Sequence, residues 1–172
     1  MTDDLLAAKE YAEAENYAKA WPIVSRLLND EPDDPKAMCL AAFMLDKQNN
    51  HALAYHIAKR VTQNYPANPT AWLNFGKCCD SLWRMEEAEA AYRRALNNVK
   101  AGDDETKMII FNNLSAMFLQ MGKFNEARGY SERALKLAPS SVGTFLEEKF
   151  SEDELKAVVA FLQSPAYIKF QQ

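Results

Sequence analysis

Apolar and small residues recur in this chain with a period of 34 residues. Proline follows this interval at Pro32 and Pro66. Alanine occupies one position of four successive periods, the last of them displaced by five residues: Ala20, Ala54, Ala88 and Ala127. A period of this length is typical of stacked helical repeats, in which one helix pair cannot bury its apolar face alone. The pattern therefore predicts an all-α solenoid.

The register divides the chain into four predicted helix-turn-helix repeats, over residues 1–34, 35–68, 69–102 and 108–141, with an insert at 103–107. Small residues at positions 8 and 20 of each repeat let two antiparallel helices cross closely. Mostly larger residues at positions 4, 7 and 11 are expected to fill the space beside the crossing. Proline at position 32 lacks an amide hydrogen and is expected to end the second helix.

Local signals set the predicted helix ends. Asp34 and Asn68 each precede a proline, which places a capping side chain before a residue suited to the first helical position. Gly102 is expected to adopt a left-handed conformation after the third repeat. Acidic residues fill the start of the insert and favour a helix N-terminus there. We therefore expect the insert to extend the first helix of the fourth repeat.

The end of the chain, residues 142–172, departs from the repeat. A capping box at residues 151–154 predicts the start of another helix. Its apolar stripe has helical spacing: Leu155, Val158, Val159 and Leu162. We expect this helix to cap the apolar surface of the last repeat. The apolar tail at residues 167–170 is expected to fold back, to join a neighbouring chain as a homo-oligomer contact, or to mark where a longer protein was cut.

The most specific motifs lie in the third and fourth repeats. The third carries Trp72-Leu73-Asn74-Phe75-Gly76, followed by Ala88, Tyr92, Ala95 and Leu96. The fourth carries Phe111-Asn112-Asn113-Leu114-Ser115, followed by Gly122-Lys123-Phe124, Ala127, Ala134-Leu135 and Pro139. These residues resemble the tetratricopeptide repeat family, and four repeats would cover 136 of the 172 residues. The resemblance implies a right-handed solenoid whose first helices line a concave groove for another protein.

The resemblance also implies which side chains face a ligand in that groove. The candidates are Lys9, Lys36, Leu40, Phe43, Leu73, Asn74, Lys77, Asn112, Asn113 and Gln120. The aliphatic and aromatic members predict an apolar centre flanked by amides. Such a centre suits an extended peptide of mixed character or an amphipathic helix.

Asn74 and Asn113 hold the same position in successive repeats, and an amide can donate to and accept from one peptide unit. A similar asparagine ladder is found in the repeat domains of O-linked N-acetylglucosamine transferases. The alternative is that these amides only join one helix to another. The lysine, asparagine and arginine set with which some co-chaperones hold the acidic C-terminus of heat-shock chaperones is missing from the matching positions, so we do not expect that function.

Composition excludes several function classes. The net charge is −4 and the isoelectric point about 5.3, so no basic field favours nucleic acid. No nucleophile pattern or glycine-rich loop indicates an enzyme or a cofactor. The two histidines, His51 and His56, are five residues apart and predict no metal site. The three cysteines are interpreted as small apolar core residues in a reducing compartment, with a thiol switch as the alternative.

The N-terminus is acidic and lacks the basic and apolar regions of a signal peptide. No apolar stretch approaches the length that spans a bilayer. The sequence therefore predicts a cytoplasmic, non-catalytic module that binds another protein as an adaptor, scaffold or assembly factor. Two alternatives stay open: a targeting domain of a larger enzyme such as a glycosyltransferase, and a self-assembling structural module.

Overall fold

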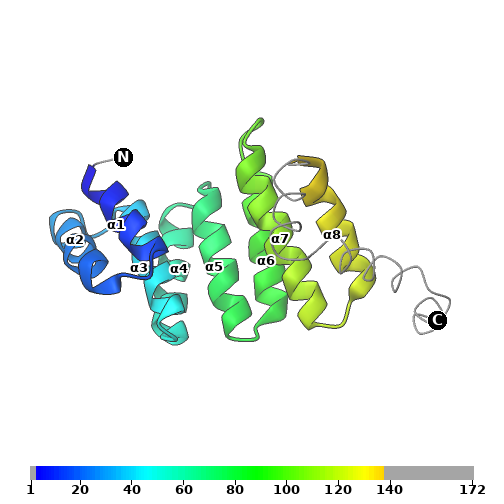
Figure 1. Cartoon of the computed structure of the whole chain (residues 1–172), viewed down its shortest axis with the longest axis horizontal. Coiled ribbons are helices and arrows are strands. Elements are labelled where there is room, and N and C mark those ends of the chain that lie inside the picture. The colour runs from blue at the N-terminus through cyan, green and yellow to red at the C-terminus, as the bar shows by residue number, and fades with distance from the viewer. Residues whose placement is uncertain (1–2, 138–172) are drawn as a thin grey trace, which may run out of the picture.

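The computed structural model describes residues 3–137, which form eight α-helices and no strand. The helices are α1 (Asp3–Glu13), α2 (Tyr17–Asp30), α3 (Pro35–Lys47), α4 (His51–Asn64), α5 (Pro69–Ser81), α6 (Met85–Asn98), α7 (Asp104–Gln120) and α8 (Phe124–Leu137). They pack in four consecutive antiparallel pairs, which follow one another along a single stack (Figure 1). The predicted all-α solenoid is confirmed. The capping helix and tail predicted within residues 142–172 lie outside the described residues.

The first helix of each pair lies on the inner face of the stack. α1 contacts α3, α3 contacts α5, and α5 contacts α7, whereas each second helix packs mainly against its own partner and the first helix of the next pair. Since neighbouring first helices approach one another more closely than neighbouring second helices do, the stack curves toward the first helices. Their outward side is therefore the concave face of the molecule.

Capping side chains begin α3 and α5 as the sequence predicts. The carboxylate of Asp34 accepts hydrogen bonds from the backbone nitrogens of Lys36 and Ala37, at 3.2 and 3.1 Å. The side-chain oxygen of Asn68 does the same at the start of α5. These bonds satisfy amide hydrogens that have no partner within the helix.

The insert also behaves as predicted. Gly102 has a φ of 87°, a left-handed conformation that costs glycine little. Asp103 then caps α7, because its carboxylate accepts a hydrogen bond from the backbone nitrogen of Thr106 at 3.1 Å. α7 consequently starts at Asp104 and runs for 17 residues, so the insert extends the helix.

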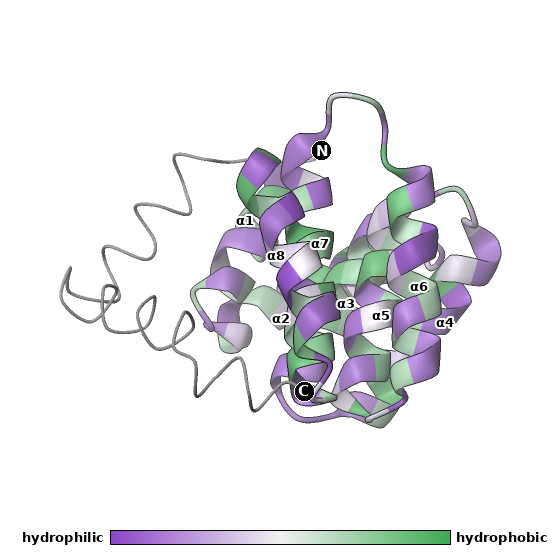
Figure 2. Ribbon diagram, turned by 90° about the vertical axis from the view of Figure 1, so that its right-hand side faces the viewer, coloured by the Kyte–Doolittle hydropathy of each residue, from purple (hydrophilic) through white to green (hydrophobic). Residues whose placement is uncertain are grey.

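The core is built around close helix crossings. The alanines at position 20, Ala20, Ala54 and Ala88, are fully buried. Gly76 lies directly against the ring of Tyr92, which is also fully buried: a Cβ built on Gly76 would lie 2.6 Å from the ring carbon Cε1. Hydrophobic residues lie mainly between the helices and polar residues mainly on the outer surface (Figure 2). The crossings at positions 8 and 20 therefore pack as expected.

The turns inside the helix pairs share one conformation that the residue types do not predict. One residue of each turn is left-handed: Glu15 (φ 56°), Asn49 (φ 62°), Trp83 (φ 58°) and Gly122 (φ 71°). Only the glycine avoids a steric cost there. The shape of the turn therefore follows the position in the repeat, and the side chain at that position is free to vary.

Candidate functional site

The concave face holds a groove of about 420 Å³ that several helix pairs form together. The α1–α2 end contributes Glu13 and Glu15, α3 contributes Phe43, Asp46 and Lys47, α5 contributes Lys77, Asp80 and Ser81, and α7 contributes Asn113. These residues are distant in sequence and meet because the first helices stack side by side. The groove is therefore a product of the solenoid and of no single repeat.

Three of the ten predicted groove residues line this space, namely Phe43, Lys77 and Asn113. Four others are exposed on first helices but lie outside its lining: Lys9, Lys36, Asn112 and Gln120. Leu40 is half-buried and packs against the N-terminal core cluster.

Leu73 is a core residue and does not reach the groove. Only 6 % of its surface is exposed, and it packs in the largest core cluster, with residues of α3 to α8. The sequence assigned it to the groove by its position in the repeat. On α5 that position turns inward, toward the neighbouring helices.

The two asparagines of the predicted ladder make hydrogen bonds within the chain. The Asn74 Nδ2 atom donates to the backbone oxygen of Cys39 at 3.5 Å, which links α5 to α3. The Asn113 Nδ2 atom donates to the backbone oxygen of Ile109 at 2.7 Å, within α7. One donor of each amide therefore serves the fold. A role of either residue in peptide contact stays a prediction.

Two carboxylates line the groove from neighbouring first helices, Asp46 on α3 and Asp80 on α5. Asp46 Oδ1 lies 2.8 Å from Nδ1 of His51, and Asp46 Oδ2 accepts a hydrogen bond from the Ser81 hydroxyl at 3.2 Å. Asp80 has a buried Oδ1 atom with no hydrogen-bond partner among the described residues. Burial, and next the charge of Asp46, raise the pKa of Asp80 above the ordinary aspartate value.

The predicted candidates do not include Asp46. The signal that could have found it is the repeat itself, because Asp46 and Asp80 both hold position 12. Equivalent positions on stacked helices lie next to one another, so two acidic residues there predict neighbouring carboxylates.

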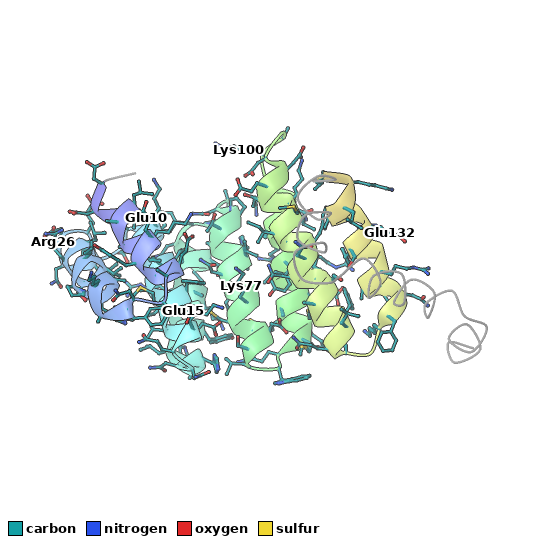
Figure 3. The ribbon with its side chains drawn as sticks, viewed as in Figure 1. Glu10, Glu15, Arg26, Lys77, Lys100 and Glu132 are labelled. Atoms are coloured by element: carbon teal, nitrogen blue, oxygen red, sulfur yellow. The ribbon has the colours of Figure 1, made fainter. Side chains whose placement is uncertain are left out.

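Two lysines supply the positive charge of the groove. Figure 3 shows Lys77 on α5, near the middle of the solenoid, with Glu15 toward the α1–α2 end. Burial, and next the nearby charge of Lys47, lower the pKa of Lys77. Within residues 3–137 the Lys77 ammonium makes no ion pair or hydrogen bond. The Lys47 Nζ atom lies 5.9 Å from the ring centroid of Phe43.

The three cysteines are buried and unpaired. Burial raises the pKa of Cys39 to about 11, and raises the pKa of Cys78 and of Cys79 to about 12. These thiols are therefore protonated near neutral pH, which suits their interpretation as small core residues.

Among the described residues, no group of three or more histidine, cysteine or acidic side chains is arranged to hold a metal ion. Over residues 3–137, no helix has the length and apolar character needed to cross a membrane.

Two family models match the chain. One is described as "Anaphase-promoting complex, cyclosome, subunit 3" and matches residues 5–95, and the other is described as "Tetratricopeptide repeat" and matches residues 67–140. The chain belongs to the tetratricopeptide repeat family. Together the two models span all eight helices of this tetratricopeptide repeat solenoid except the first two residues of α1. Comparison with curated protein sequences finds no match.

Solved structures of other tetratricopeptide repeat solenoids superimpose on this chain. PilF of Pseudomonas aeruginosa aligns with a TM-score of 0.71 and 22 % identity, over 84 % of this chain and 64 % of that one. MamA of Desulfovibrio magneticus RS-1 aligns with a TM-score of 0.63 and 18 % identity, over 80 % of this chain and 75 % of that one. At these identities the similarity shows a shared fold.

Proposed function

We propose that this chain is a non-catalytic adaptor or scaffold module that binds a segment of another protein along its concave face. The observation that carries the proposal is the groove between α1, α3, α5 and α7, which combines the Phe43 ring with charged and amide side chains. The lining is mostly charged and polar, with the Phe43 ring as its main apolar part, and concave sites where polar groups converge are common binding sites.

The dimensions of the groove favour an extended segment over a folded surface. A volume of about 420 Å³ accommodates a few side chains. An extended segment advances about 3.3 Å per residue, so a short stretch can cross several neighbouring first helices. A dissociation constant near 1 μM, about 8 kcal/mol, would be ordinary for such a contact.

The family comparison supports a role in assembly. One matching family model describes a subunit of a multi-protein complex. We infer a cytoplasmic location as well, which the three unpaired cysteines support because thiols persist in reducing compartments.

A peptide-display selection on the full chain tests the proposal. The groove variant is Lys47→Ala with Asn113→Ala, because both side chains line the groove and neither lies in the core. The matched control is Asn125→Ala with Lys136→Ala, which makes the same chemical changes at exposed positions on α8. We expect one shared peptide motif, bound at least about tenfold more weakly by the groove variant and equally well by the control.

Equal binding to both double variants would place the peptide elsewhere on the molecule. Recovery of no motif would contradict the proposal that the chain recognises a short segment.

A further inference from the structure

Among the described residues, Lys77 is the one half-buried cation that makes no ion pair, and Lys47, exposed and also without an ion pair, lines the same groove. Several cations outside the groove pair with carboxylates: Arg26 with Asp4 at 2.7 Å, Arg60 with Asp33 at 2.7 Å, and the half-buried Lys107 with Asp104 at 2.8 Å. Lys47 and Lys77 lie close enough for the charge of one to lower the pKa of the other. Neither forms an ion pair within residues 3–137.

The groove carboxylates make no ion pair with either lysine, although the charge of Asp46 favours the charged form of Lys77. Asp46 already uses one oxygen for His51 and the other for Ser81. Asp80 keeps its Oδ1 atom buried and unpaired. Glu13 lies 3.5 Å from Lys9 on its own helix. Within residues 3–137, the two ammonium groups of the groove therefore have no direct ion pair, and that of Lys77 is half-buried.

We propose that Lys47 and Lys77 together bind an acidic side chain of the protein segment that occupies the groove. The inference rests on the proposed function and specifies the chemistry of the partner. Two cations held side by side repel each other, and a carboxylate between them removes that repulsion while making charge-assisted hydrogen bonds. A half-buried ammonium gains more from such a bond than an exposed one, because water screens it less.

The remaining charges of the groove set a direction for the bound segment. Glu13 and Glu15 lie at the α1–α2 end, and the two lysines lie on α3 and α5. The Phe43 ring lies on α3, beside Lys47. A complementary segment carries an acidic residue at the lysines, an apolar residue on the ring, and a basic residue toward the α1–α2 end.

The test uses the full chain and a display library of random 12-residue peptides. Selections are run on the wild type, on Lys77→Gln and on Lys77→Glu, with Lys100→Gln as the control at an exposed lysine outside the groove (Figure 3). Fluorescence anisotropy then measures the dissociation constants of two peptides. The first is the peptide recovered on the wild type, and the second is its neutral analogue, in which the Asp or Glu is changed to Asn or Gln. Far-UV circular dichroism checks that each variant folds. If Lys77→Gln does not fold, Lys47→Gln replaces it, because the Lys47 side chain is exposed.

We expect an acidic residue at one fixed position of the wild-type motif. Lys77→Gln should bind the acidic peptide about 10- to 100-fold more weakly than the wild type does, and the neutral analogue about equally well. Lys77→Glu should shift selection at that position toward Lys or Arg, and Lys100→Gln should behave as the wild type.

Three results would overturn the inference, and they separate it from the proposed function. If the recovered motif has no acidic residue but its binding still depends on Lys47 and Asn113, the proposed function stands and this inference is wrong. If no motif is recovered, both the proposed function and this inference are wrong. A molecular mass that rises with concentration in the wild type, and not in Lys77→Gln, assigns the groove to a second copy of the chain instead.

Discussion

At Gly76, α5 crosses α6 so closely that packing leaves no room for a larger side chain. Replacing Gly76 with alanine has two opposing effects on the free energy of unfolding. Alanine favours the helix by about 1 kcal/mol relative to glycine. The new Cβ, however, would lie 2.6 and 2.7 Å from two ring carbons of Tyr92, whose ring is fully buried and cannot move into solvent. Overpacking of this kind costs about 1–3 kcal/mol.

Because two ring carbons lie inside contact distance, we take the upper part of that range. Gly76→Ala should then lower the free energy of unfolding by about 1–2 kcal/mol. Gly129→Ala is the matched control, since Gly129 lies inside α8 and, among the described residues, no atom other than the nearby backbone of its own helix lies within 4 Å of the added Cβ. It should raise the free energy of unfolding by about 0.5–1 kcal/mol.

Urea unfolding followed by far-UV circular dichroism measures both variants, with the slope of the transition checked for constancy. Tyr92→Leu in the Gly76→Ala background should recover part of the loss, which a double-mutant cycle detects as coupling. If Gly76→Ala stabilised the chain as much as Gly129→Ala, the close crossing of α5 and α6 would be refuted.

Three further predictions follow from the caps, the thiols and the groove carboxylates. Asp34→Ala should lower the free energy of unfolding by about 1 kcal/mol, whereas Asn50→Ala should change it little, because the Asn50 side chain makes no capping bond; urea titrations compare the two. The three buried cysteines, whose pKa burial raises to about 11 or 12, should resist iodoacetamide at pH 8 until the chain unfolds, and mass spectrometry of intact labelled protein counts the additions. Asp80→Asn should stabilise the chain at pH 7, because a raised pKa of Asp80 means that the folded state disfavours its charged form. This gain in the free energy of unfolding should disappear as the pH falls below the ordinary aspartate pKa, because the carboxyl is then protonated in the folded and the unfolded state. A gain that persists at that pH would contradict the burial of a charged Asp80 as its cause.

Much of the fold could be predicted because each signal is local or periodic. The capping residues Asp34 and Asn68 precede prolines, and the alanines at position 20 recur at a fixed interval, so neither requires knowledge of distant contacts. The extended α7 was predictable for the same reason, from Gly102 and the acidic residues after it. The left-handed turn at Trp83 could not be predicted, because a bulky residue gives no local signal for that conformation and the neighbouring helices impose it.

The site was harder to predict than the fold. Position in the repeat indicates which helix carries a side chain, but small rotations of the helix decide whether that side chain enters the core, as Leu73 does, or the groove, as Lys77 does. The partners of Asp46 come from α4 and α5, at sequence separations of 5 and 35 residues. Such contacts depend on how the repeats stack, which the sequence of one chain does not specify.

The most direct test of the central claim is to locate a bound peptide by amide chemical shifts. A peptide recovered by display is titrated into ¹⁵N-labelled full-length protein. We expect the largest shift changes on the inner helices α3 and α5, around Phe43, Lys47 and Lys77, with little change on α4, α6 and α8. Shift changes concentrated on the outer helices would contradict the claim that the concave face is the binding surface.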